Sequence, residues 1–150
     1  MVLYTPKGEI IFQHREKDKD TYPDLLDATV GGHVEIGSDY ENAALQEMKE
    51  ETGINATKNN LIFIQMIRSK TYDKVTGMTN NVIRAIYSYR YDNKVKDLRV
   101  EKGKAIEFEA WPFEKIFNIS DEDRKRFIPV ILEDEMFGIF RKIQSCISKS

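Results

Sequence analysis

Three glutamates near the middle of the chain, Glu47, Glu50 and Glu51, constrain its fold more than any other feature. Residues three and four positions apart are neighbours on an α-helix, so a helix over residues 39–52 presents all three carboxylates on one face. Like charges at these spacings destabilise a helix by about 0.2–0.5 kcal/mol per pair, and the C-terminal end of a helix also disfavours anions. A hard divalent cation compensates for this repulsion, because Mg²⁺ and Mn²⁺ take carboxylate oxygens. The alternative is a solvated acidic face, relieved by Lys49, and the spacing alone leaves both open.

The boundaries of this helix can be predicted from its flanking residues. Ser38 or Asp39 can serve as the N-cap, because each is followed three residues later by a polar side chain, Glu41 or Asn42. Gly53 is a typical residue to end a helix. The sequence therefore predicts a helix from Asp39 to Thr52.

The rest of the chain predicts a mixed α+β fold in a single domain over residues 1–150. The elements interleave without the regular spacing of a parallel βαβ array. In the last predicted strand, Ile106, Phe108 and Ala110 alternate with Glu107 and Glu109, which is typical of a half-buried strand. We expect a hairpin of Val2–Tyr4 and Glu9–Arg15 around a turn at residues 5–8, strands at Leu61–Arg68, Val82–Tyr91 and Ala105–Ala110, and a helical segment from Ser120 to Arg141 that Pro129 interrupts or restarts.

Composition excludes several classes of function. A formal net charge of −2 provides no broad basic field, which disfavours a nucleic-acid polymer as partner. No apolar run approaches eighteen residues, so we expect no membrane partner. The single cysteine, Cys146, forms no internal disulfide, and with only His14 and His33 it makes no Cys-rich zinc site. Cytoplasmic localisation is therefore expected.

The segment from Gly32 to Ile54, GHVEIGSDYENAALQEMKEETGI, resembles the 23-residue Nudix box. Its flanks are similar to the same family: GEIIFQHR precedes the box and EFEAWPFEKI follows it. The stretch YPDLLDATVGGHVEIG is similar to the subgroup that includes isopentenyl-diphosphate isomerase-like members. The matching positions are Gly32, Glu47, Met48, Glu50, Glu51, Gly53 and Ile54.

Two positions depart from the family pattern. Ser38 stands where the family has its first glutamate, and Gln46 stands where it has an arginine that pairs with the box glutamates. Gln46 can hydrogen-bond but supplies no charge, so the carboxylates should repel one another more strongly. For Ser38, a helix cap is the alternative to a functional role.

The resemblance implies a Nudix-type α/β/α sandwich with a mixed sheet and a loop-helix-loop metal site. It also implies a hydrolase that cleaves a diphosphate linkage in a small molecule, such as a nucleoside diphosphate derivative, with Mg²⁺ or Mn²⁺ as cofactor. By that likeness the Gly32 carbonyl, Glu47, Glu50 and Glu51 hold the metal, and Glu50 and Glu51 are also catalytic. Glu107, outside the box, is the first candidate for a further acidic catalytic residue, with Glu109 and Glu101 as alternatives.

Other residues are weaker candidates. His14, Arg15 and Arg68 lie near the ends of predicted strands and can bind phosphate oxygens, or are ordinary surface residues. Tyr22 and Tyr72 can stack on a base or cover an apolar substrate tail, whereas a lone tryptophan in a strand, Trp111, is expected in the core.

Competing functions remain open. Isomerisation in this family uses a cysteine before the box, and Cys146 lies elsewhere, so we set that reaction aside. A non-catalytic nucleotide- or metabolite-binding module is the alternative, because Ser38 and Gln46 depart from the box. Apolar residues near the C-terminus, Phe137, Ile139 and Phe140, are compatible with a homodimer.

Overall fold

Strands and helices interleave along the chain in the computed structural model, which describes residues 1–34, 37–72, 77 and 79–147. Within these ranges, no helix combines the length and apolar character needed to cross a membrane. The strands are β1 (Val2–Thr5), β2 (Glu9–Arg15), β3 (Leu26–Asp27), β4 (Ile62–Tyr72), β5 (Thr79–Arg90) and β6 (Ala105–Pro112). The helices are α1 (Tyr40–Thr52), α2 (Phe113–Phe117), α3 (Asp121–Arg124) and α4 (Asp134–Ile147), with 3₁₀ turns η1 (Lys58–Asn60), η2 (Val95–Asp97) and η3 (Pro129–Leu132).

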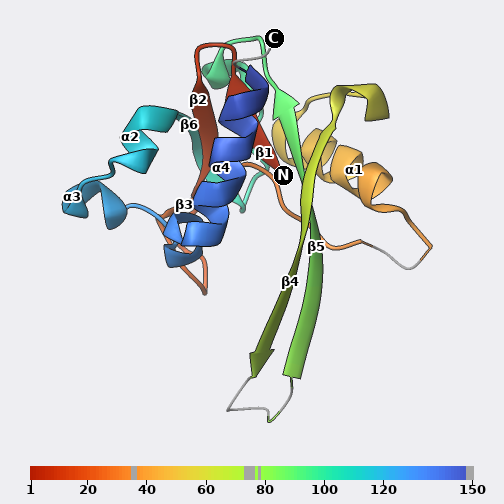
Figure 1. Ribbon diagram of the computed structural model, residues 1–150, viewed down its shortest axis with the longest axis horizontal. Helices are drawn as coiled ribbons and strands as arrows, with labels where there is room; N and C mark the ends of the chain where they lie inside the picture. The colour runs from red at the N-terminus through yellow and green to blue at the C-terminus, as the bar shows by residue number, and fades with distance from the viewer. Residues whose placement is uncertain (35–36, 73–76, 78, 148–150) are drawn as a thin grey trace.

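The strands form one mixed sheet with the order β3-β2-β1-β5-β4, and β6 pairs along β2. β1 runs parallel to β5, while the other pairs are antiparallel. Figure 1 shows the β4–β5 hairpin projecting well beyond the rest of the molecule. These two strands are longer than predicted, because their pairing continues out to Tyr72 and Thr79.

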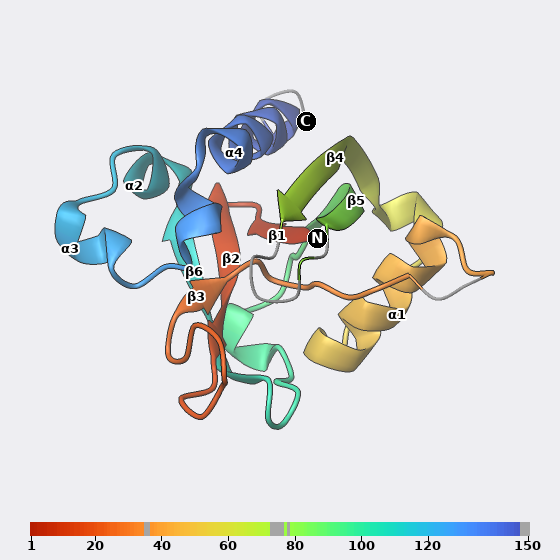
Figure 2. The ribbon, with the colours of Figure 1, turned by 90° about the horizontal axis from the view of Figure 1, so that it is seen from below.

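The predicted N-terminal hairpin is confirmed, and its apolar runs are buried on both faces. Because side chains alternate along a strand, Val2 and Phe12 pack in the cluster with α4, and Leu3 and Ile11 pack in the cluster with α1. Figure 2 shows α4 and α1 on different sides of β1 and β2. This two-sided burial confirms the predicted α+β class and the α/β/α sandwich.

The sixth strand is confirmed but buries different residues than alternation predicts. Trp111 is in the core as expected, whereas Ile106 is exposed rather than buried. Both faces of β6 are covered, but at different points along it. Phe108 packs in the cluster on the α1 side, and Trp111 packs in the cluster on the α4 side.

The C-terminal segment is broken into α3, η3 and α4 rather than forming one helix. Pro129 begins η3, as its missing N–H permits at the first position of a helix. Ile139 and Phe140 are fully buried and Phe137 is packed against the same core. The interpretation of these three residues as a dimer surface is therefore wrong, because amphipathic α4 turns them inward.

Gly53 ends α1 in a left-handed conformation, with φ at 76° and its N–H bonded to the Lys49 carbonyl. Gly53→Ala is expected to lower the free energy of unfolding by about 1–2 kcal/mol, because a Cβ is strained at positive φ. The matched control is Gly138→Ala inside α4, where an added Cβ meets nothing within 4 Å. That change should stabilise the protein by about 0.5–1 kcal/mol. Urea unfolding of both variants measures these free energies. Equal losses of stability in the two variants would contradict the role of the positive φ at Gly53.

Candidate functional site

The start of α1 is fixed by Asp39. Its carboxylate accepts a hydrogen bond from the Asn42 backbone N–H at 2.7 Å. This bond lowers the pKa of Asp39, and a hydrogen bond from the Lys58 ammonium lowers it further. Asp39 is thus the N-cap, and the interpretation of Ser38 as the cap is wrong.

Met48 orients the helix on the sheet. Its side chain is fully buried and packs in the cluster that contains Leu3 and Ile11. Glu51 and Thr52 follow Met48 by three and four residues, so they share its inward face. Both are buried, at 1% and 2% exposure. One of the three acidic side chains is therefore carried into the protein interior.

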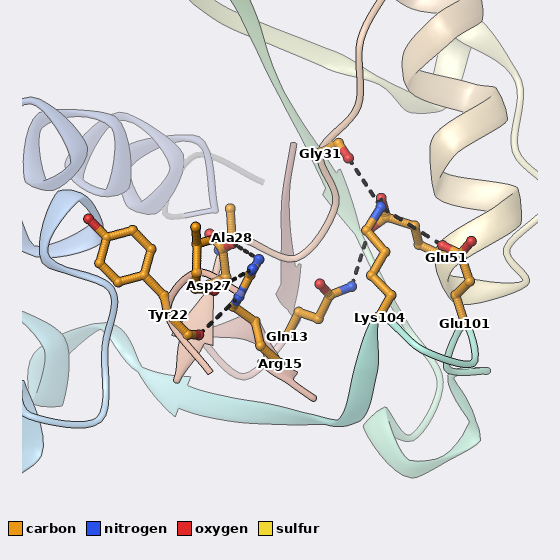
Figure 3. A network of polar contacts seen from close by, with 10 residues as sticks. Gln13, Arg15, Tyr22, Asp27, Ala28, Gly31, Glu51, Glu101 and Lys104 are labelled. Carbon is orange, nitrogen blue, oxygen red and sulfur yellow. Dashed lines mark hydrogen bonds and ion pairs between the residues drawn. The ribbon is translucent and has the colours of Figure 1, made fainter. Parts of the chain in front are cut away.

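Glu51 lies in a polar network that joins α1 to the sheet (Figure 3). Gln13 of β2 donates to its carboxylate at 3.2 Å, and the Lys104 ammonium forms an ion pair with it. Lys104 also reaches the Gly31 carbonyl oxygen at 3.4 Å and the Glu101 carboxylate at 3.8 Å. The buried carboxylate is thus hydrogen-bonded and charge-paired by residues far away in the sequence.

The electrostatics of Glu51 reflect this balance. Burial raises the pKa of Glu51, because the charged form loses its hydration. The Lys104 ammonium opposes this shift in pKa, and a backbone hydrogen bond from Gly31 does so to a smaller extent. Lys104 is therefore the principal side chain that favours the charged form of Glu51.

Glu47 packs directly on Gly32. A Cβ built on Gly32 would lie 2.0 Å from Glu47 Cδ and 2.1 Å from Oε1, distances at which atoms overlap. Only glycine leaves room for the carboxylate at this point. The structure thus brings together two of the box residues predicted from the sequence, Gly32 and Glu47.

Glu50 faces outward and is exposed. Gln46 donates to its carboxylate at 3.1 Å across one turn of the helix. The glutamine that replaces the family's arginine therefore still contacts a box glutamate, through a hydrogen bond from an uncharged amide.

The three glutamates occupy three different environments. Among the described residues they do not form a set of three ligand atoms within 4.8 Å of one another. Glu47 beside Gly32 fits a hard divalent cation as one ligand, because such a cation prefers carboxylate oxygens. Glu51 fits less well, because Lys104 already neutralises it.

Glu107 is not brought to the box glutamates. It pairs with His14 across β2 and β6, one residue along from the Gln13–Phe108 pair. Because neighbouring side chains point to opposite faces of a sheet, Glu107 lies on the other face from Gln13 and Glu51. There His14, Glu107 and Glu109 gather, with His14 Nδ1 lying 3.6 Å from an oxygen of each glutamate.

The guanidinium of Arg15, a candidate phosphate-binding group, is hydrogen-bonded to residues between Thr21 and Asp27. It donates to Asp27 at 3.2 Å and to the Thr21 and Tyr22 carbonyls at 2.9 and 3.1 Å. Figure 3 shows this group beside the Glu51 network.

Sequence reasoning missed Gln13 and Lys104. Gln13 did carry a signal, since it is polar and follows the apolar run Ile10–Phe12. Lys104 carried none, because its partner lies 53 residues away.

This chain is similar in sequence to known Nudix proteins. The NUDIX domain family model matches residues 1–131. An uncharacterized Nudix hydrolase of Clostridium acetobutylicum is 35% identical over 91 residues, which are 60% of this chain and 41% of that protein. The chain therefore spans less than half the length of this relative.

Solved structures share the fold. The MutT protein of Methanosarcina mazei Go1 superposes with a TM-score of 0.67 at 17% identity, covering 95% of this chain and 89% of that one. The NUDIX domain of Shewanella oneidensis NrtR, solved with ADP ribose, gives 0.63 at 11% identity, covering 97% and 84%. The isomerase-like subgroup stays a prediction. Because the NUDIX domain model matches most of its length, the chain belongs to the Nudix family.

Proposed function

We propose that this protein is a metal-dependent hydrolase that cleaves a diphosphate linkage in a small molecule, such as a nucleoside diphosphate derivative. The observation that carries this proposal is the packing of Glu47 on Gly32, which places a carboxylate on the backbone at the start of the box. Both residues match the family motif, and a side chain at residue 32 would destroy the contact.

Glu47, Glu50 and the Gly32 carbonyl would hold Mg²⁺ or Mn²⁺, which are oxygen-preferring cations. When bound, such an ion neutralises a diphosphate and polarises its P–O bonds. Glu50 is exposed and accepts a hydrogen bond from Gln46, which supports a role for it as the group that would accept a proton from the attacking water. Glu51 would hold α1 in position against the sheet through its bonds to Gln13 and Lys104.

A turnover screen tests this proposal. The purified protein is incubated with a panel of nucleoside diphosphate sugars, ADP-ribose and dinucleoside polyphosphates, with Mg²⁺, Mn²⁺ or EDTA. We expect at least one compound to yield a nucleoside monophosphate in the presence of metal, and none to do so in EDTA. The substrate, the cytoplasmic location and a homodimer stay predictions.

The second candidate is a non-catalytic module that binds a nucleotide or a similar metabolite. The buried Lys104–Glu51 ion pair favours it, because it removes one carboxylate from the acidic set. The NUDIX domain of NrtR was solved with ADP ribose, a ligand of this chemical class. Saturable binding of a panel compound without product at any Mg²⁺ or Mn²⁺ concentration would establish this function instead.

A further inference from the structure

Lys104 occupies a position with the surroundings of a cation site. Its ammonium, with three N–H donors, is surrounded by three oxygen acceptors: the Glu51 carboxylate, the Gly31 carbonyl and the Glu101 carboxylate. Carboxylate and carbonyl oxygens are also the ligands that Mg²⁺ and Mn²⁺ take in proteins. Figure 3 shows Lys104 extended between Gly31 and Glu51.

We infer that Lys104 is a built-in cation that takes the place of a divalent ion at Glu51, so that Glu51 is a positioning residue and not a metal ligand in this protein. This inference rests on the proposed metal site, and it revises the ligand set expected from the box. It also names Lys104 as the residue that limits how many ions the site holds.

Burial makes this pairing persistent. Glu51 is 1% exposed, so its charge has no water to replace a lost partner. Removing one member of a buried ion pair is strongly unfavourable, because an uncompensated charge remains. A divalent ion that approached Glu51 would have to displace the ammonium or lie beside a like charge.

The other two glutamates lack such a partner. Among the described residues, no lysine or arginine forms an ion pair with Glu47 or Glu50. Their charges are available to an ion, whereas that of Glu51 is already balanced. Glu47 and Glu50 are thus the box glutamates that can bind a metal ion, whereas Glu51 is paired with Lys104.

A double-mutant cycle on metal binding tests this division. Mn²⁺ is titrated into the wild type, Glu51→Gln, Lys104→Met and the double variant, and free Mn²⁺ is followed by electron paramagnetic resonance. We expect Glu51→Gln to leave the number of bound ions and their affinity close to the wild-type values. Lys104→Met should bind one additional Mn²⁺ or bind Mn²⁺ at least about tenfold more tightly, and Glu51→Gln added to it should abolish the gain.

The contrary result is a loss of Mn²⁺ affinity of about tenfold or more in Glu51→Gln with Lys104 present. That outcome would make Glu51 a ligand and overturn the inference. This contrary result is measured on Glu51→Gln alone, and that substitution keeps the shape of the side chain. The inference can therefore be overturned even where Lys104→Met fails to fold. Lys104→Gln provides a second test of the gain.

The same titration separates this inference from the proposed function. Wild-type binding of Mn²⁺ that Glu47→Gln weakens and Glu51→Gln does not supports both. Binding that both substitutions weaken keeps the metal site and rejects the role of Lys104. An absence of Mn²⁺ binding in every variant, Lys104→Met included, contradicts both.

Discussion

Gly32→Ala is expected to abolish most of the metal-dependent turnover, with a loss of about 100-fold or more in kcat/KM, because displacement of a positioned group by about 1 Å has costs of that order. The added Cβ would lie 2.0 Å from Glu47 Cδ, so the carboxylate must leave its place on the backbone. Glu47 ends a flexible side chain that can move away, and the fold should survive. The measurement is kcat/KM on the best substrate of the screen, together with Mn²⁺ affinity.

Gly31→Ala is the matched control. A Cβ on Gly31 meets nothing within 4 Å, although the residue adjoins Gly32. Its carbonyl still accepts from Lys104, so turnover should remain close to that of the wild type. Equal losses in the two variants would show that the loop as a whole, rather than the Glu47 contact, is sensitive to substitution.

Lys104→Met is expected to have the largest effect on stability. In EDTA at pH 8 the free energy of unfolding should fall by about 3–5 kcal/mol, because a buried carboxylate is left unpaired. Adding Glu51→Gln should recover much of that loss, since a neutral amide replaces the isolated charge. Urea unfolding of the single and double variants measures both effects. The control is Lys102→Met, which changes an exposed lysine two residues away.

The loss in Lys104→Met should depend on pH with a definite sign. The folded-state pKa of Glu51 is raised by burial, so protonation favours the folded state below the unfolded value. That contribution disappears as the pH rises through the folded-state pKa. Without Lys104 this pKa rises further, so the loss should be small near pH 4.5 and grow toward pH 8. A loss that is independent of pH would mean that Lys104 acts through packing alone.

Local patterns predicted much of the fold. The β1–β2 hairpin and α1 follow from short-range signals: an apolar run either side of a turn, a capping residue and a terminal glycine. The β4–β5 extension could not be predicted, because long-range pairing rather than local composition sets its length. The core position of Phe137 and its neighbours depended on which face of α4 meets the sheet.

The site could be predicted only along the helix that carries it. The resemblance of residues 32–54 to the Nudix box indicated Glu47, Glu50 and Glu51 as candidates, and the structure adds that each has a different environment. The partners of Glu51 come from β2 and from the segment before β6, 38 and 53 residues away along the chain. Such contacts depend on strand order, which a single sequence does not specify, so Lys104 escaped prediction.

The central claim is that the protein hydrolyses a diphosphate linkage with a divalent metal. Its most direct test compares the wild type with Glu50→Gln in one assay that measures turnover and identifies the product. The account predicts that the wild type releases a nucleoside monophosphate from a diphosphate substrate only with Mg²⁺ or Mn²⁺. Glu50→Gln, which leaves an exposed amide in place of the proton acceptor, should reduce the rate by about 100-fold or more. No release by the wild type at any metal concentration, or equal rates for the two proteins, would contradict it.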